Sequence, residues 1–317
     1  MWFCGSGANK RVCFGEERVG ERRLNMNYIV ERYVDNKRFN QQYEEIYHFL
    51  LNAGELEYGE HFHWGRFEWM MCHSMLDISH LDEVALFRND SREIVGLVTY
   101  DTKFDGTAYI LHSINDRKLL EMMLDFVISN YPVEGELYIA VNLKDELLCE
   151  VLKENGYAKK FDGEGVLQMS LNSNLDYHIP CEYKISSRDF TSDNWKYQMV
   201  IHRGFNHEDI PEKWNDELFL PTPNYGRELK VFALKDEEYC AHCGVWYTEN
   251  GTAYIEPVVT IPECRNRGLA KAVVYEALGR ARELGAKRAI VLSKQPFYFK
   301  IGFELSTEVT YWIKENE

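Results

Sequence analysis

The sequence lacks several features that would place it in a specialised class of proteins. No apolar run in its 317 residues approaches the roughly 18 to 20 residues needed to cross a bilayer. The first residues show no charged start followed by an apolar stretch, so we expect no secretory signal. The eight cysteines are scattered through a chain of ordinary size, which argues against a disulfide scaffold. These absences favour a globular cytoplasmic protein with no membrane partner.

Positive charge is also scarce in this chain. Lysine and arginine number 36 against 51 aspartates and glutamates, a formal net charge of −15 at pH 7. Such a chain repels nucleic acid and anionic membranes unless it carries a concentrated basic patch, so we expect no nucleic-acid partner. It would attract cationic molecules such as amines, although acidity also serves solubility alone.

Residues 1–25 differ from the rest of the chain, because they follow no helical or strand period and mix Gly, Cys and Arg without pattern. An Arg22-Arg23 pair encoded AGG-AGG would place a ribosome-binding sequence shortly before the codon of Met26. We therefore exclude residues 1–25 from the fold as a non-native or disordered extension, and we expect translation to start at Met26.

The pentapeptide GTAYI occurs twice, at residues 106–110 and 251–255. A strand, a polar turn and a second strand are predicted before each copy. A helix, a strand, a short helix ending in Gly plus an aromatic residue, and a last alternating strand that closes the copy are predicted after it. The repeat predicts two α/β units with mixed sheets, at residues 26–172 and 177–317, joined by a polar linker.

The segment after the second GTAYI has the pattern of a phosphate-binding loop. Residues 265–270, RNRGLA, lead from a strand into a helix that begins at about Gly268. The unpaired amides and the dipole of a first helical turn favour an anion, and Gly268 allows its close approach. Arg265, Arg267 and Lys271 add positive charge. The spacing matches neither GxxxxGK[ST] nor GxGxxG, which disfavours NTP hydrolysis and a Rossmann cofactor.

Arg265-x-x-Gly268-x-Ala270 resembles the signature [QR]-x-x-G-x-[GA] of the GCN5-related N-acetyltransferase (GNAT) family. Tyr298 also stands four residues before a Gly-Phe pair, as in that family. The strong match covers about residues 228–305, while the fold-level match covers both halves, as in family members with two tandem domains. The resemblance implies two tandem acyl-CoA N-acyltransferase folds, with acetyl-CoA as cosubstrate and no metal.

The resemblance further implies which residues bind the cosubstrate. Strand amides near residues 258–260 would pair with the pantetheine arm and polarise the thioester carbonyl, and amides of residues 266–271 would hold the pyrophosphate. The expected cofactor-binding residues are Val258, Val259, Thr260, Arg265, Asn266, Arg267, Gly268, Leu269, Ala270 and Lys271. The family often has Asn before the short helix that carries Tyr298, where this chain has Ser293-Lys294-Gln295.

Two residues are the expected catalytic groups. Tyr298 would protonate the departing CoA thiolate, although its aromatic neighbours also fit a core position. Glu256 stands where some family members place the base that takes a proton from the acceptor ammonium. Glu256 has two other interpretations, as a group that binds a cationic acceptor or as a solvated carboxylate at a strand end. The transfer would be direct, without an acyl-enzyme.

The first copy lacks the features of the second. It has no glycine between Ile110 and Tyr131, Asn115-Asp116 stands where the phosphate loop should be, and Leu152 takes the place of Tyr298. We expect the first copy to bind no CoA and to have a structural role, such as forming a wall of the acceptor site.

These features predict an acetyl-CoA-dependent N-acetyltransferase acting on the primary amine of a small molecule, as a monomer or homodimer. Transfer to a peptide or protein N-terminus, a longer acyl donor, and a CoA-binding sensor or scaffold without turnover remain open. The His-rich segment 60–69 and the pair Cys240-x-x-Cys243 lack partner ligands for zinc. The aromatic residues of segment 60–69 fit helix packing or a wall of the substrate site, and we expect the two cysteines to pack in the core. The loop 202–209 lies where family members often shape the acceptor site.

Overall fold

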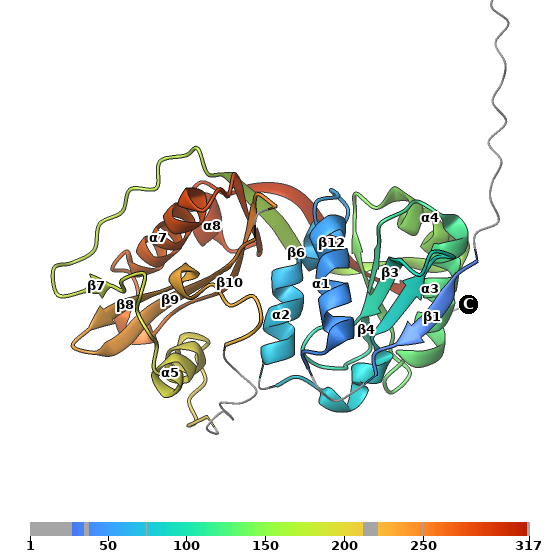
Figure 1. Ribbon diagram of the computed structural model, residues 1–317, viewed down its shortest axis with the longest axis horizontal. Coiled ribbons are helices and arrows are strands. Elements are labelled where there is room, and N and C mark those ends of the chain that lie inside the picture. Colours follow the sequence, from blue (N-terminus) through green and yellow to red (C-terminus); the bar gives the residue numbers. More distant parts are fainter. Residues whose placement is uncertain (1–26, 35–37, 74, 212–220, 249, 316–317) are drawn as a thin grey trace, which may run out of the picture.

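The computed structural model describes residues 27–34, 38–73, 75–211, 221–248 and 250–315 (Figure 1). The extension predicted at residues 1–25 lies outside these described residues. The described strands form one twelve-stranded sheet in the order β1-β2-β3-β4-β5-β12-β6-β11-β10-β9-β8-β7. No helix in the described ranges is both long and apolar enough to cross a membrane.

The first half of the chain contributes six strands and four α-helices to the described structure. Its strands are β1 (Ile29–Arg32), β2 (Ala85–Arg88), β3 (Ile94–Thr99), β4 (Thr107–His112), β5 (Tyr138–Asn142) and β6 (Tyr157–Ser170). Its helices are α1 (Gln41–Ala53), α2 (Trp64–Cys72), α3 (Arg117–Asn130) and α4 (Glu146–Glu154), with 3-10 turns η1 (Glu60–Phe62) and η2 (Ile78–Glu83).

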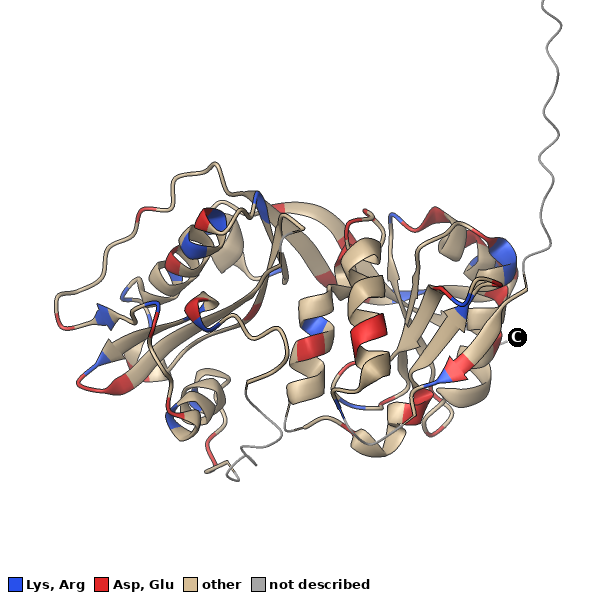
Figure 2. Ribbon diagram, in the orientation of Figure 1, with Lys and Arg blue, Asp and Glu red and all other residues tan. Residues whose placement is uncertain are grey.

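The described part of the second half is built in the same way. Its strands are β7 (Lys184–Ile185), β8 (Lys230–Lys235), β9 (Glu238–Trp246), β10 (Thr252–Thr260), β11 (Arg288–Leu292) and β12 (Glu304–Lys314). Its helices are α5 (Asn194–Gly204), α7 (Leu269–Glu283) and α8 (Pro296–Lys300), with 3-10 turns η3 (Arg227–Leu229) and η4 (Pro262–Cys264). Helices α5 and α7 lie on opposite sides of the sheet (Figure 1), and Lys and Arg are scattered among Asp and Glu over both halves (Figure 2).

The two GTAYI copies occupy equivalent positions in the structure. Gly106 and Gly251 both turn the chain with positive φ angles of 88° and 90°. Residues 107–109 then pair in parallel with β5, and residues 252–254 pair in parallel with β11. In each half an antiparallel meander leads into this parallel pair through a crossover helix, α3 or α7. The predicted mixed α/β sheet is therefore confirmed.

The last strand of each half joins the other half. β6 pairs antiparallel with β11 through residues 166–170, and β12 pairs antiparallel with β5 through residues 309–312. β6 and β12 also pair with each other along most of their length, and they bridge the two halves at the middle of the sheet (Figure 1). The expectation that each alternating strand closes its own copy is wrong. The linker near residues 172–176 divides the sequence but does not divide the sheet.

Helix α2 packs the first half against the second. All nine of its residues are buried. A Cβ added at Gly65 would lie 2.4 Å from Cβ of Trp246 and 3.1 Å from Cδ1 of Tyr254, so only glycine permits this contact. Trp64 meets Trp246 edge-on, with ring centroids 6.3 Å apart. The aromatic residues of segment 60–69 thus lie in the core, as the sequence predicts.

Gly65→Ala is expected to lower the free energy of unfolding by about 1–3 kcal/mol, because the added methyl group overlaps Trp246 between the two halves. Gly279→Ala in α7 is the matched control. A Cβ there meets nothing within 4 Å, and alanine in a helix interior should stabilise the protein by about 0.5–1 kcal/mol. Denaturant unfolding of both variants makes the comparison. Equal stabilities would contradict the close packing of α2 on β9.

Candidate active site

A cleft opens where β10 separates from β11. The two strands pair only through residues 252–254, and the pairing of β10 with β9 changes register between Ile255 and Val258. Beyond this bulge the edge of β10 that faces away from β9 has no strand partner among the described residues. Residues 258–260 of that edge line a cavity of about 580 Å³. A free strand edge beside a cavity presents backbone amides to an extended ligand.

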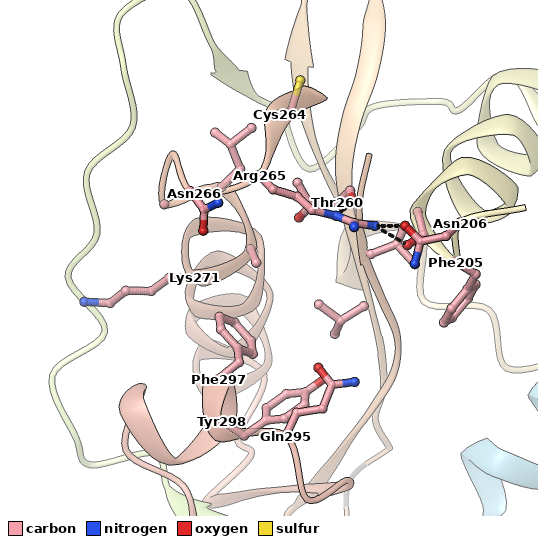
Figure 3. Close-up of a pocket in the computed structure, with 16 residues that line it drawn as sticks. Phe205, Asn206, Thr260, Cys264, Arg265, Asn266, Lys271, Gln295, Phe297 and Tyr298 are labelled. Atoms are coloured by element: carbon pink, nitrogen blue, oxygen red, sulfur yellow. Dashed lines mark hydrogen bonds between the residues drawn. The ribbon is translucent and has the colours of Figure 1, made fainter. Parts of the chain in front are cut away.

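Most of the predicted site residues lie around this cavity (Figure 3). The predicted cofactor-binding residues that line it are Val258, Val259, Thr260, Arg265, Asn266, Gly268, Leu269, Ala270 and Lys271, and the predicted catalytic residue Tyr298 lines it as well. Two predicted site residues, Glu256 and Arg267, are outside the lining. The guanidinium of Arg267 lies 3.8 Å from the carboxylate of Glu182.

Helix α7 points an uncapped N-terminus at the cavity. Its N-cap is Gly268, which has φ +81° and provides no side-chain hydrogen bond to the first turn. Asn or Asp side chains cap α1, α3, α4 and α5 in the described structure. The first-turn amides of α7, together with the helix dipole, therefore remain open to an anion.

The equivalent helix of the first half, α3, is closed by its own side chain. Asp116 caps it by accepting a hydrogen bond from the amide of Lys118 at 2.8 Å. The hydroxyl of Tyr28 donates to the same carboxylate at 2.6 Å. A carboxylate thus occupies the position that a phosphate takes at an open helix end, and its negative charge repels an anion. This geometry supports the expectation that the first half does not bind CoA.

Arg265 shapes the wall of the cavity instead of presenting a free charge. Its guanidinium donates to the carbonyl oxygens of Thr260 and Gly204 at 3.0 and 2.9 Å and to Oδ1 of Asn206 at 2.7 Å. These bonds tie the end of β10 to the end of α5. Lys271 extends away from the centre of the cavity (Figure 3). The uncapped backbone amides at the start of α7, and not the Arg265 side chain, are therefore the open hydrogen-bond donors on this side of the cavity.

Sequence reasoning missed three residues that line the cavity, Cys264, Gln295 and Phe297. Gly204, Phe205 and Asn206 also line it and belong to the loop 202–209, which the sequence analysis placed near the acceptor site. A Cβ at Gly204 would lie 2.4 Å from Cβ of Val259, so a glycine is needed where α5 meets β10. Gln295 stands in the segment that lacks the usual family Asn, and its side-chain amide points into the cavity beside Tyr298 (Figure 3). The missing Asn was the one signal that could have indicated Gln295.

Residues 195–303 match the family model described as the acetyltransferase (GNAT) family. The second half carries a GNAT domain. Similar solved structures include a GCN5-related N-acetyltransferase from Sphaerobacter thermophilus, at 14% identity and a TM-score of 0.54, covering 90% of this chain and 95% of that one. Another, from Kribbella flavida, is 17% identical with a TM-score of 0.50, covering 70% of this chain and 86% of that one.

A tandem GNAT protein from the clavulanic acid biosynthesis pathway is 10% identical, with a TM-score of 0.53, and the match covers 90% of this chain and 97% of that protein. Because the Sphaerobacter and clavulanic acid pathway matches each cover 90% of this chain, they show that its fold is the tandem GNAT fold, as the sequence predicts. No curated protein matches the chain.

Glu256 lies in the bulge of the GNAT domain, where β10 leaves β11. Its Oε2 accepts a hydrogen bond from the hydroxyl of Tyr254 at 2.5 Å. Burial raises the pKa of Glu256 to about 7, against the lowering effects of the Arg66 charge and of the Tyr254 bond. A carboxyl group with this pKa is close to half ionised at neutral pH and is able to accept a proton from an ammonium group.

Tyr298 lies on the short helix α8 of the GNAT domain. It is buried, and its ring packs on Phe297 and Phe303 with centroids 5.0 and 5.7 Å away. Burial raises the pKa of Tyr298, and the nearby Cys243 and Glu256 raise it further. The hydroxyl therefore stays protonated at neutral pH and can donate a proton into the cavity.

The remaining candidates of the sequence analysis lie next to this site, because Cys243 acts electrostatically on Tyr298 and residues 204–206 of the loop 202–209 line the cavity. Cys240 and Cys243 are buried in β9. In the described structure, ligand atoms of His202, His207 and Asp209 lie within 4.8 Å of one another. Nε2 of His202 hydrogen-bonds to the carbonyl oxygen of Asp209 at 2.8 Å and to its carboxylate at 3.0 Å, which folds the loop against α5.

The carboxyl of Glu256 should titrate with a midpoint near pH 7. Tyr254→Phe should move the midpoint to higher pH, because the lost hydrogen bond stabilises the ionised form. A titration of ¹³C-labelled glutamate by NMR measures both values, and Glu256→Gln assigns the signal. An ordinary midpoint near 4.5 in the intact protein would contradict the buried setting.

Proposed function

We propose that the chain is an acetyl-CoA-dependent N-acetyltransferase that transfers the acetyl group directly to the primary amine of a small molecule. The observation that carries this proposal is one cavity that joins the free edge of β10, the uncapped N-terminus of α7 and Tyr298. The diphosphate, the extended pantetheine arm and the thioester of acetyl-CoA would each meet a matching group in this cavity. The GNAT match of residues 195–303 supports the same class of reaction.

Each part of acetyl-CoA would meet a different element. The amides of residues 266–271 would bind the pyrophosphate, and the edge of β10 at residues 258–260 would pair with the pantetheine arm as an added strand. One strand amide would donate to the thioester oxygen, which stabilises the negative charge that develops there in the transition state. Gln295 is placed to bond the amide-rich end of the arm.

The proton transfers follow from the two pKa shifts. The acceptor arrives as an ammonium, and Glu256 takes one proton from it. The free amine attacks the thioester carbon, so that a C–N bond forms and the C–S bond breaks. Tyr298 donates its proton to the leaving thiolate, which departs as CoA. The nitrogen of the new amide loses a second proton, which reprotonates Tyr298, and the proton held by Glu256 returns to solvent. The products are the N-acetyl amide and CoA.

Calorimetry should find one acetyl-CoA site per chain, because α7 is open and α3 is capped by Asp116. Gly268→Asp should weaken binding by about 30-fold or more, since a carboxylate would then replace the phosphate at the helix end. Gly156→Asp is the matched control, because Gly156 also has positive φ and an added Cβ meets nothing within 4 Å. Two sites per chain would show that the first half binds CoA.

Glu256→Gln and Tyr298→Phe should each lower kcat by about 100-fold or more and leave the Kd of acetyl-CoA unchanged, because both act on protons in the transition state. In a plot of log kcat/KM against pH, the values should rise at low pH and level off above an apparent pKa near 7, where Glu256 becomes ionised. This dependence on pH should disappear in Glu256→Gln. Tyr138→Phe, on β5, is the control. A protein that binds acetyl-CoA and acetylates no primary amine is a sensor or scaffold, and the proposal is then wrong.

A further inference from the structure

A second cavity, of about 510 Å³, lies in the first half beside α2. Its walls come from three parts of the fold: Arg66 of α2, Asp101 and Asp105 after β3, and Glu164 and Tyr311 of the exchanged strands β6 and β12. Segments that are distant in the sequence thus bring three carboxylates to one hollow.

The charges in this cavity are unequally buried. Arg66 is 8% exposed, and its guanidinium donates to Asp101 at 2.7 Å and to the hydroxyl of Tyr109 at 3.2 Å, and it lies 3.4 Å from Glu164. The side chains of Asp101 and Glu164 are 37% and 47% exposed. The buried guanidinium of Arg66 therefore holds the carboxylates of Asp101 and Glu164 in place by ion pairs, while part of each carboxylate side chain stays exposed in the cavity.

The balance of charge in the cavity is negative. Among the described residues that line the cavity, the carboxylates of Asp101, Asp105 and Glu164 are accompanied by two Arg or Lys side chains, Arg66 and the exposed Lys103. His73 also lines the cavity, but burial lowers its pKa to about 4, so it is neutral at pH 7. A cation entering this space gains attraction, whereas a carboxylate would be repelled and would find Arg66 already paired.

Arg66 also connects this cavity to the reaction centre. The preceding residue, Gly65, lies so close to the ring of Tyr254 that a Cβ added to it would be 3.1 Å from Cδ1, and the Tyr254 hydroxyl donates to Glu256. Arg66, Asp101 and Glu164 all act electrostatically on the carboxyl of Glu256. The carboxylates of the first half therefore lie within electrostatic reach of the group that would receive the acceptor's proton.

We propose that this cavity, lined by Asp101, Glu164 and Asp105, binds a second ammonium of the acceptor, so that the acceptors are diamines and polyamines. One terminal amine would reach Glu256 while another ammonium pairs with Asp101 and Glu164. The proposal rests on the acetyltransferase function above. It gives the first half, which has no open phosphate site, the task of selecting the acceptor.

The test is calorimetric binding of 1,4-diaminobutane and of butylamine to the full chain with CoA present. The two probes share one carbon chain and differ by one ammonium. The intact protein should bind the diamine at least about 10-fold more tightly, and added salt should reduce the difference. The double variant Asp101→Asn/Glu164→Gln should lose this preference. Asp125→Asn, an exposed carboxylate on α3, is the control and should keep it.

Kinetics separates binding of the acceptor from catalysis. In the double variant, KM for the diamine should rise about 10-fold or more, while KM for acetyl-CoA and KM for butylamine stay unchanged. Asp105→Asn tests the site without breaking an ion pair of Arg66, and a rise of about 3-fold in diamine KM is expected. Unchanged acetyl-CoA affinity shows that each variant is folded.

The outcomes distinguish this proposal from the acetyltransferase function. If the double variant keeps the diamine preference, or if the intact protein binds both amines equally, the acceptor site is wrong even when amines are acetylated. If amino acids are preferred over diamines, a carboxylate is recognised and the proposal is overturned. Diamine binding that depends on Asp101 and Glu164, without acetyl transfer, supports the site and refutes the enzyme.

Discussion

The pairing of β6 with β12 at the centre of the sheet is the contact on which the rest of the structure depends. Each strand leaves the half that encodes it and pairs with the parallel strand of the other half. Neither half therefore has a complete sheet of its own. The same exchange carries Glu164 and Tyr311 to the cavity beside α2, so the joint between the halves also forms part of the wall of that cavity.

The two halves show how a small change at a helix end separates two copies of one fold. α3 and α7 follow the same GTAYI strand and cross to equivalent parallel strands. Gly268 leaves the amides of α7 open, whereas Asp116 satisfies an amide of α3 with a carboxylate. The first amides of a helix need a hydrogen-bond acceptor from outside the helix. Asp116 supplies that acceptor at α3 in the first half, whereas no side chain of the described residues caps α7 in the second half, so that a ligand can take this place.

The electrostatics of the candidate site belong to both halves. Burial in the GNAT domain raises the pKa of Glu256, and Arg66 of the first half limits this rise. Arg66 is itself held by Asp101 and Glu164, and it reaches this position because Gly65 lets α2 lie directly on Trp246. The packing of one helix thus links the ionisation of Glu256 to the charge in the neighbouring cavity.

Local patterns in the sequence by themselves determined the duplication, the mixed sheet, the open helix at Gly268 and the positions of Glu256 and Tyr298. Turn glycines, periodicity and short spacings carry that information. Only the tertiary structure decided which strand neighbours β6 and β12, because alternation specifies the buried face of a strand and not its partner. It likewise decided that Arg265 hydrogen-bonds to the end of α5, that the guanidinium of Arg267 lies near Glu182, and that Asp101 and Glu164, distant in the sequence, meet at Arg66. The direction of a long charged side chain depends on neighbours that the chain brings together only when it folds.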